Sequence, residues 1–156
     1  MDTRRRLFCA LVAASAVALA MIPVSAVAVE TPFKGKFRAV ETSQVAFPTI
    51  SISREGTGTA THLGKYTVEV TLQGNLLTLT ATGTATFTAA NGDTLTASVV
   101  GQATPTGPTT LSIVEVYTIT GGTGRFAGAT GTFTLEISLD QTTGVSTGAF
   151  RGSIVR

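Results

Sequence analysis

Glu115 and Tyr117 form the pair of side chains in this sequence best suited to acid–base chemistry. They stand two residues apart in the stretch LSIVEVYTI, and Leu111, Ile113 and Ile119 share their face. Residues two apart in a β-strand point to the same side of the sheet. If that side is the interior, a carboxylate and a phenol lie together in an apolar cavity. Burial would then raise the pKa of the Glu115 carboxyl and make it a candidate acid or base.

Two points about this pair stay open in the sequence. The stretch has apolar residues on both faces, so the alternative is that Val114 and Val116 point inward and Glu115 is solvated. Tyr66, from a different expected strand, would join the pair if its side chain also points inward. Glu115, Tyr117 and Tyr66 are therefore the candidate ligand-binding residues of the interior, and the sequence does not determine a catalytic set.

The remaining reactive residue types give no recognisable site. His62 is the only histidine, so it cannot form a multi-histidine metal site, and its place in ATHLGKY favours a role in pinning a loop. No G-x-S-x-G nucleophile motif is present. Asp93 and Asp140 stand beside expected turns, where aspartate is common. The sequence therefore predicts neither a metal nor a cofactor.

A glycine-rich segment, residues 121–131, separates two alternating stretches. Gly122, Gly124 and Ala127 match the dinucleotide-binding pattern G-x-G-x-x-A, but that pattern requires a helix immediately afterwards. Gly128 and Gly131 would interrupt such a helix, and the alternation returns at once in GTFTLEISL. We therefore interpret the segment as a turn between strands. The turn motif consists of Gly121, Gly122, Gly124, Arg125 and Phe126.

Arg125 and Phe126 within this turn have structural interpretations that need no ligand. An isolated exposed arginine is an anion-binding candidate, but it is more typical of a solvated side chain or one tied to a neighbouring strand end. The Phe126 ring is expected to close one end of the fold by burying apolar area.

Period-two alternation runs through almost the whole chain after Glu30 and predicts an all-β fold. Thr78 to Thr88 supplies the longest example, with threonines on one face and mostly small or apolar residues on the other. Turns are expected at NGD (91–93), LQGN and DQTTG, with a Pro/Gly loop at TPTGP. Pro48 weakens one strand and suggests an edge or a bulge. The expected strands are 33–40, 44–53, 56–62, 65–72, 76–89, 94–103, 110–120, 131–139 and 145–155.

Eight or nine short strands with tight connections predict a single antiparallel β-barrel of eight strands or similar. Closure into a barrel removes the exposed strand edges that would promote aggregation. No linker or second domain interrupts the pattern, so the barrel domain is expected to span residues 29–156.

The first 28 residues have the layout of a secretory signal peptide. Three consecutive arginines, Arg4 to Arg6, precede an uncharged, Ala-rich run, and Ala26 and Ala28 form an A-x-A cleavage signal. We expect cleavage after Ala28, a secreted or periplasmic product and no stable membrane span after cleavage. The alternative is an uncleaved anchor, because the run is long enough to cross a bilayer.

Removal of this leader changes the charge and the cysteine content. Asp2 and the three arginines carry the whole net charge of +2, and the remainder has eight Lys and Arg against eight Asp and Glu. Without a basic patch interleaved with aromatic residues, no nucleic-acid partner is expected. The only cysteine, Cys9, leaves with the leader, so the domain must be stabilised by its core without disulfides.

The segment ITGGTGRFAGATGTFTLE resembles the glycine-rich segment of dirigent proteins and allene oxide cyclases. This resemblance implies an eight-stranded antiparallel barrel, secreted or plastid, often assembled as a trimer. The wider pattern of GTGTATHLGKYTVEV, FTAANGDTL and TGAFRGSI also resembles secreted bacterial proteins for which no activity is known. The functional residues of the plant families do not match positions of this chain, so their chemistry is not carried over.

Three functional hypotheses follow from these observations. The first is a secreted barrel that binds a small apolar ligand or a protein partner without catalysis. The second is a cyclase or isomerase in which Glu115, Tyr117 and Tyr66 act by acid–base and shape control. The third is a surface or assembly protein with its threonine faces outward. The sequence also leaves open whether the protein forms a homo-oligomer, either a trimer or a dimer.

Overall fold

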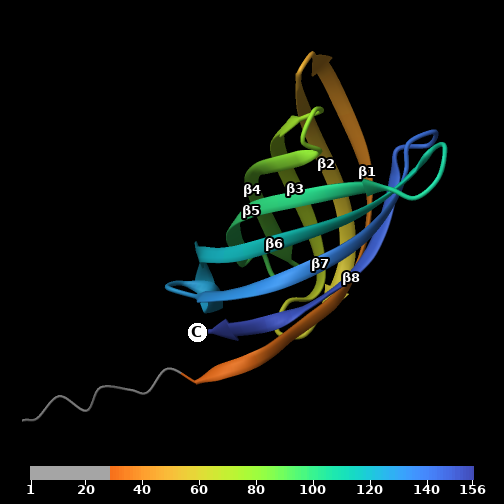
Figure 1. The fold of residues 1–156 in the computed structure, drawn as a ribbon. Coiled ribbons are helices and arrows are strands. Elements are labelled where there is room, and N and C mark those ends of the chain that lie inside the picture. The colour runs from red at the N-terminus through yellow and green to blue at the C-terminus, as the bar shows by residue number, and fades with distance from the viewer. Residues whose placement is uncertain (1–28) are drawn as a thin grey trace, which may run out of the picture.

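The computed structural model describes residues 29–156, so the expected signal peptide (1–28), with Cys9, lies outside the described residues. The described residues form eight antiparallel strands and one short 3-10 helix, η1, between β6 and β7 (Figure 1). Within these residues, no helix is long and apolar enough to cross a membrane. The elements are β1 (Glu30–Ala46), β2 (Thr49–Ala60), β3 (Gly64–Asn75), β4 (Thr80–Ala89), β5 (Thr94–Pro105), β6 (Thr110–Gly122), η1 (Gly124–Phe126), β7 (Thr130–Asp140) and β8 (Val145–Val155).

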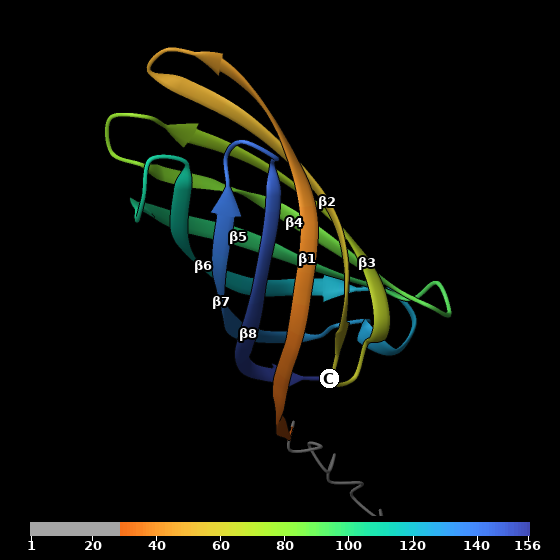
Figure 2. The same ribbon diagram turned by 90° about the vertical axis from the view of Figure 1, so that its right-hand side faces the viewer.

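The strands close into a barrel in which each strand pairs with its neighbours in the sequence. β1 completes the circle by pairing with both β2 and β8, for example Phe37 with Gly58 on one side and with Gly148 on the other. Figure 2 shows the long, bent β1 beside β8, with the strands twisting around a common interior. The prediction of a single closed antiparallel barrel is confirmed.

The expected strand over residues 44–53 is wrong, because the chain turns in its middle. Phe47 and Pro48 form the connection between β1 and β2, and the Thr49 hydroxyl donates to the carbonyl of Ala46 at 2.7 Å. Proline has no N–H for a ladder and fixes its own φ, which suits a turn as well as an edge or bulge. Residues 56–60 then continue β2, so the barrel has eight strands rather than nine.

The turn expected at LQGN is also misplaced. β3 continues through Asn75, and the reversal occurs over residues 76–79. The Asn75 side-chain oxygen accepts a hydrogen bond from the Leu77 N–H at 2.8 Å, and Leu79 has a φ of 55°. Asparagine therefore starts the turn by bonding the backbone two residues later, which delays the start of β4 to Thr80. The turns expected at 91–93 and 141–144 are present.

Alternation decides which residues fill the barrel. At the end where β1 begins, six aromatic rings pack against one another at centroid distances between 4.7 and 6.5 Å. Most of these pairs meet edge to face and one pair is stacked, and both arrangements add stability beyond the area that they bury. These rings are Phe33, Tyr66, Phe87, Tyr117, Phe133 and Phe150.

The glycine-rich segment closes this aromatic end of the barrel. Gly121 and Gly122 end β6, and residues 124–126 form η1 before β7 starts at Thr130. Gly124 has a φ of 55°, and a Cβ there would lie 1.9 Å from an Asp93 carboxylate oxygen, so the position requires glycine. The Phe126 ring is fully buried. No helix of dinucleotide-binding length follows it within residues 29–156.

Candidate functional site

The other half of the barrel is open and forms a cavity of about 510 Å³. Its mouth lies among the β3–β4, β5–β6 and β7–β8 connections, which gather on one side of the barrel with the β1–β2 turn (Figure 2). The cavity exists because β4 and β5 contribute small residues at this level, including Ala81, Gly101 and Ala103. The apolar residues of the wall are Ile50, Ile52, Leu72, Leu76, Leu79, Ala81, Ala103, Leu111, Ile113 and Leu139.

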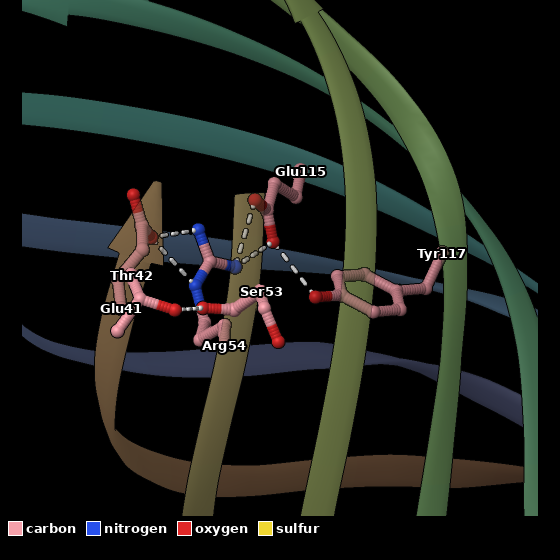
Figure 3. Close-up of polar contacts among 6 residues, drawn as sticks. All are labelled: Glu41, Thr42, Ser53, Arg54, Glu115 and Tyr117. Carbon is pink, nitrogen blue, oxygen red and sulfur yellow. Dashed lines mark hydrogen bonds and ion pairs between the residues drawn. The ribbon is translucent and has the colours of Figure 1, made fainter. Parts of the chain in front are cut away.

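Three charged side chains form the floor of the cavity. Arg54 on β2 stands opposite Glu41 on β1 in the strand register, and Nε and Nη2 donate to Glu41 Oε2 at 2.9 and 2.8 Å. Its Nη1 reaches across the barrel to β6 and donates to both carboxylate oxygens of Glu115 at 2.9 Å. Figure 3 shows the guanidinium held between the two carboxylates.

This ionic floor is almost completely shielded from solvent. The side chains of Arg54 and Glu115 are each 1% exposed, and that of Glu41 is 11% exposed. Burial by itself would lower the pKa of Arg54, but the charges of Glu115 and Glu41 outweigh it and raise the pKa above its ordinary value. Arg54 is therefore always charged, and the two glutamates hold it in place.

The backbone and the aromatic core leave room for this ion pair. Gly101 stands opposite Glu115 in the β5–β6 register, and a Cβ at Gly101 would lie 3.0 Å from Cγ of Glu115. On the inner side, the Arg54 guanidinium carbon lies 5.9 Å from the centre of the Phe37 ring. The floor thus separates the open half of the barrel from its packed half.

The structure places Glu115 and Tyr117 inside the barrel, while Val114 and Val116 are each 46% exposed on its outer face. The Tyr117 hydroxyl donates to Glu115 Oε2 at 2.7 Å (Figure 3), and its ring stacks on Phe133 at 4.7 Å. Burial, and then the neighbouring Glu115 charge, raise the pKa of Tyr117 well above its ordinary value. The phenol is therefore protonated at neutral pH, and its hydrogen bond holds Glu115 from the side of the packed half.

Two expectations about this site need correction. Glu115 does not lie in a purely apolar cavity, because the Arg54 guanidinium faces it. Tyr66 does not join Glu115 and Tyr117: its hydroxyl donates to the backbone carbonyl of Lys36 at 2.9 Å, and its ring packs on Phe87. Burial raises the pKa of Tyr66 above its ordinary value.

Sequence reasoning missed Arg54 and Glu41. A signal for Arg54 exists in TISISREG, where Ile50, Ile52 and Arg54 alternate and therefore share an inward face. An arginine on the apolar face of a strand requires buried carboxylate partners. The same alternation reaches Glu41 through Phe37 and Ala39 on the inward face of β1, although the residues that follow Glu41 are exposed.

Of the other residues considered from the sequence, Asp140 lies at the β7–β8 connection near the cavity, and His62, Asp93 and Arg125 lie at the opposite end of the barrel. His62, in the β2–β3 turn, has Nε2 3.2 Å from the Pro32 carbonyl and Nδ1 2.9 Å from Nη2 of Arg156. Arg125 pairs with Asp93 at 3.7 Å and lies over the Phe126 ring. No group of three or more His, Cys, Asp or Glu side chains among residues 29–156 is arranged to hold a metal ion.

Comparison with known proteins identifies the fold. No protein-family model matches the chain, and no curated protein matches it. Among solved structures, the chain is similar to a pterocarpan synthase dirigent protein, with a TM-score of 0.63 and 16% sequence identity over 91% of this chain and 99% of that chain. At this identity the likeness shows the fold alone. The protein is therefore a dirigent-like eight-stranded β-barrel that is packed at one end and open at the other.

Proposed function

We propose that the protein is an exported barrel that binds a small, mostly apolar molecule in the open half of its interior. The observation that carries this proposal is the cavity of about 510 Å³ with apolar walls over a charged floor. Ligand sites in proteins are concave, mostly apolar, of this size, and contain a few fixed polar groups. The similar dirigent structure is described as a pterocarpan synthase, which is consistent with a small organic ligand.

The rigidity of the floor supports binding. The guanidinium of Arg54 is held from two sides, and Glu115 is held in turn by Tyr117. A polar group that is already fixed in position loses little conformational entropy when a ligand arrives. The cavity therefore offers a ligand an apolar volume and a preorganised polar end.

Filling the cavity is expected to abolish most of this binding. Ala103→Phe places a ring in the open half and should weaken binding of the neutral fluorophore Nile red by about tenfold or more, since even one methylene in an apolar pocket changes affinity by this order. Fluorescence titration measures the affinity. Ala149→Phe, on the exposed outer face of β8, is the matched control and should bind as the wild-type protein does. Equal affinities for the two variants, or no binding to the wild-type protein, would contradict the proposal.

A cyclase or isomerase is the second candidate, and it is favoured by the carboxylate of Glu115 on the cavity floor. Its proposed partner Tyr117 is fully buried beneath the floor, and Tyr66 is bonded elsewhere. The binding function needs none of these groups to exchange a proton. Recovery of a bound ligand with its structure unchanged supports binding alone, whereas its conversion to an isomer supports the second candidate.

A further inference from the structure

The floor of the cavity carries more negative than positive charge. Among the residues that line the cavity, Glu41, Arg54 and Glu115 are the charged ones, so two carboxylates face one guanidinium. In low-dielectric surroundings an uncompensated charge is costly, and it attracts an opposite charge more strongly than it would in water. The floor therefore has a formal charge of −1, and this charge favours some polar groups of a ligand over others.

The unpaired acceptor on this floor is Oε1 of Glu41. Both oxygens of Glu115 accept hydrogen bonds from Arg54, and Oε2 also accepts one from Tyr117. At Glu41 both bonds from Arg54 end on Oε2, and Oε1 has no hydrogen-bond partner among residues 29–156. Figure 3 shows the two dashed lines from the guanidinium meeting at one Glu41 oxygen, while the other Glu41 oxygen points away from the guanidinium. Because Glu41 lines the cavity and its side chain is only 11% exposed, this oxygen is positioned to accept a bond from a bound molecule.

The charge balance separates three kinds of polar head group. A carboxylate would add a third negative charge beside one guanidinium, and repulsion disfavours it. A hydroxyl would donate a hydrogen bond to the ionised Oε1 but would leave the charge of −1 on the floor. A protonated amine would donate a bond in which both donor and acceptor are charged, so it gains the Coulomb attraction between opposite charges and also neutralises the floor.

We infer that the ligand class of this cavity is a cationic amphiphile: an apolar body against the wall of β2, β3, β5 and β6, with a protonated amine at Oε1 of Glu41. This inference rests on the proposed function, because it assumes that a ligand enters the cavity. It adds the head group that the ligand carries and the atom that recognises it.

Displacement of Nile red by three ligands that share one chain tests the head group. Octylamine, octanol and octanoate have the same apolar body, and at pH 7 the amine is protonated and the acid ionised. The wild-type protein should bind octylamine about tenfold or more tightly than octanol, and octanoate most weakly. Equal displacement by all three, or preference for octanoate, would overturn the inference while leaving the proposed function standing. Failure of Nile red and all three ligands to bind would overturn both.

Variants locate the recognition at Glu41. Glu41→Gln keeps a carbonyl acceptor for Arg54 but removes the negative charge, so the ratio of octylamine to octanol affinity should fall by about tenfold, towards one. Glu69→Gln makes the same chemical change on the exposed outer face of β3 and should keep the wild-type ratio. An unchanged ratio in a folded Glu41→Gln variant would overturn the assignment to Glu41. If this variant does not fold, the three-ligand series on the wild-type protein still decides the head group.

Discussion

Replacing Arg54 by methionine is expected to lower the free energy of unfolding by about 3–5 kcal/mol, the usual cost of removing one partner from a buried ion pair. Without the guanidinium, Glu115 is a buried carboxylate whose remaining partner is Tyr117, and Glu41 loses both of its bonds. Methionine fills much of the space that the arginine side chain occupied. The loss therefore comes from the two uncompensated carboxylates rather than from an empty volume.

Urea denaturation measures this effect, and two further variants show its cause. Arg151→Met removes an arginine whose ion pair with Glu136 lies on the surface at 3.9 Å, and it should change stability by about 0.5 kcal/mol or less. Adding Glu41→Gln and Glu115→Gln to Arg54→Met removes the buried charges and should restore part of the lost stability. An Arg54→Met variant no less stable than Arg151→Met would refute the buried ionic floor.

The second large effect is expected at Phe133. Its ring stacks on Tyr117 at 4.7 Å and contacts Phe33, Phe87 and Phe150, so it lies at the centre of the packed half. Phe133→Ala should lower the free energy of unfolding by about 3–5 kcal/mol, from lost burial and the cavity that the ring leaves. Chemical or thermal denaturation measures the change.

The matched control for this substitution is Phe47→Ala. Phe47 is 72% exposed in the turn between β1 and β2, so its loss should change stability by about 0.5 kcal/mol or less. Similar destabilisation by both substitutions would show that the aromatic cluster does not dominate the core. It would also remove the reason for describing one half of the barrel as packed.

The sequence was sufficient to predict the barrel because the evidence for each strand is local. Alternation in residues 131–139 matches β7 closely, since Thr132, Thr134 and Glu136 mark the outer face. The prediction fails where a residue has two compatible roles. Pro48 suits a bulge or a turn, and Asn75 both ends β3 and starts the following turn, so the bounds around them were wrong.

The site was less predictable because it depends on pairing across the barrel. Glu41 and Arg54 become neighbours only through the β1–β2 register, and Arg54 and Glu115 lie 61 residues apart in the chain. The inward face of β6 was also ambiguous, because Val116 packs on the outer surface opposite Val100, where both are exposed. Alternation gives the two faces of a strand but does not say which one a closed barrel encloses.

The division of the interior into a packed and an open half has a simple origin in the sequence. Large aromatic residues occupy inward positions near the start of β1 and the end of β8, as Phe33 and Phe150 do. Small residues occupy the inward positions at the start of β4 and the end of β5, as Ala81 and Ala103 do. The same alternating pattern therefore builds a rigid core and, beside it, a space that side chains do not fill.

Methyl NMR during titration with Nile red tests this account most directly. Ring currents from the bound dye should shift the methyl signals of Ile52, Leu72 and Ile113, which line the cavity, and leave those of Leu95 and Ile154 in the packed half unchanged. Shifts confined to outward residues such as Val100 and Val116, or no shifts at any methyl group, would contradict a ligand-binding interior.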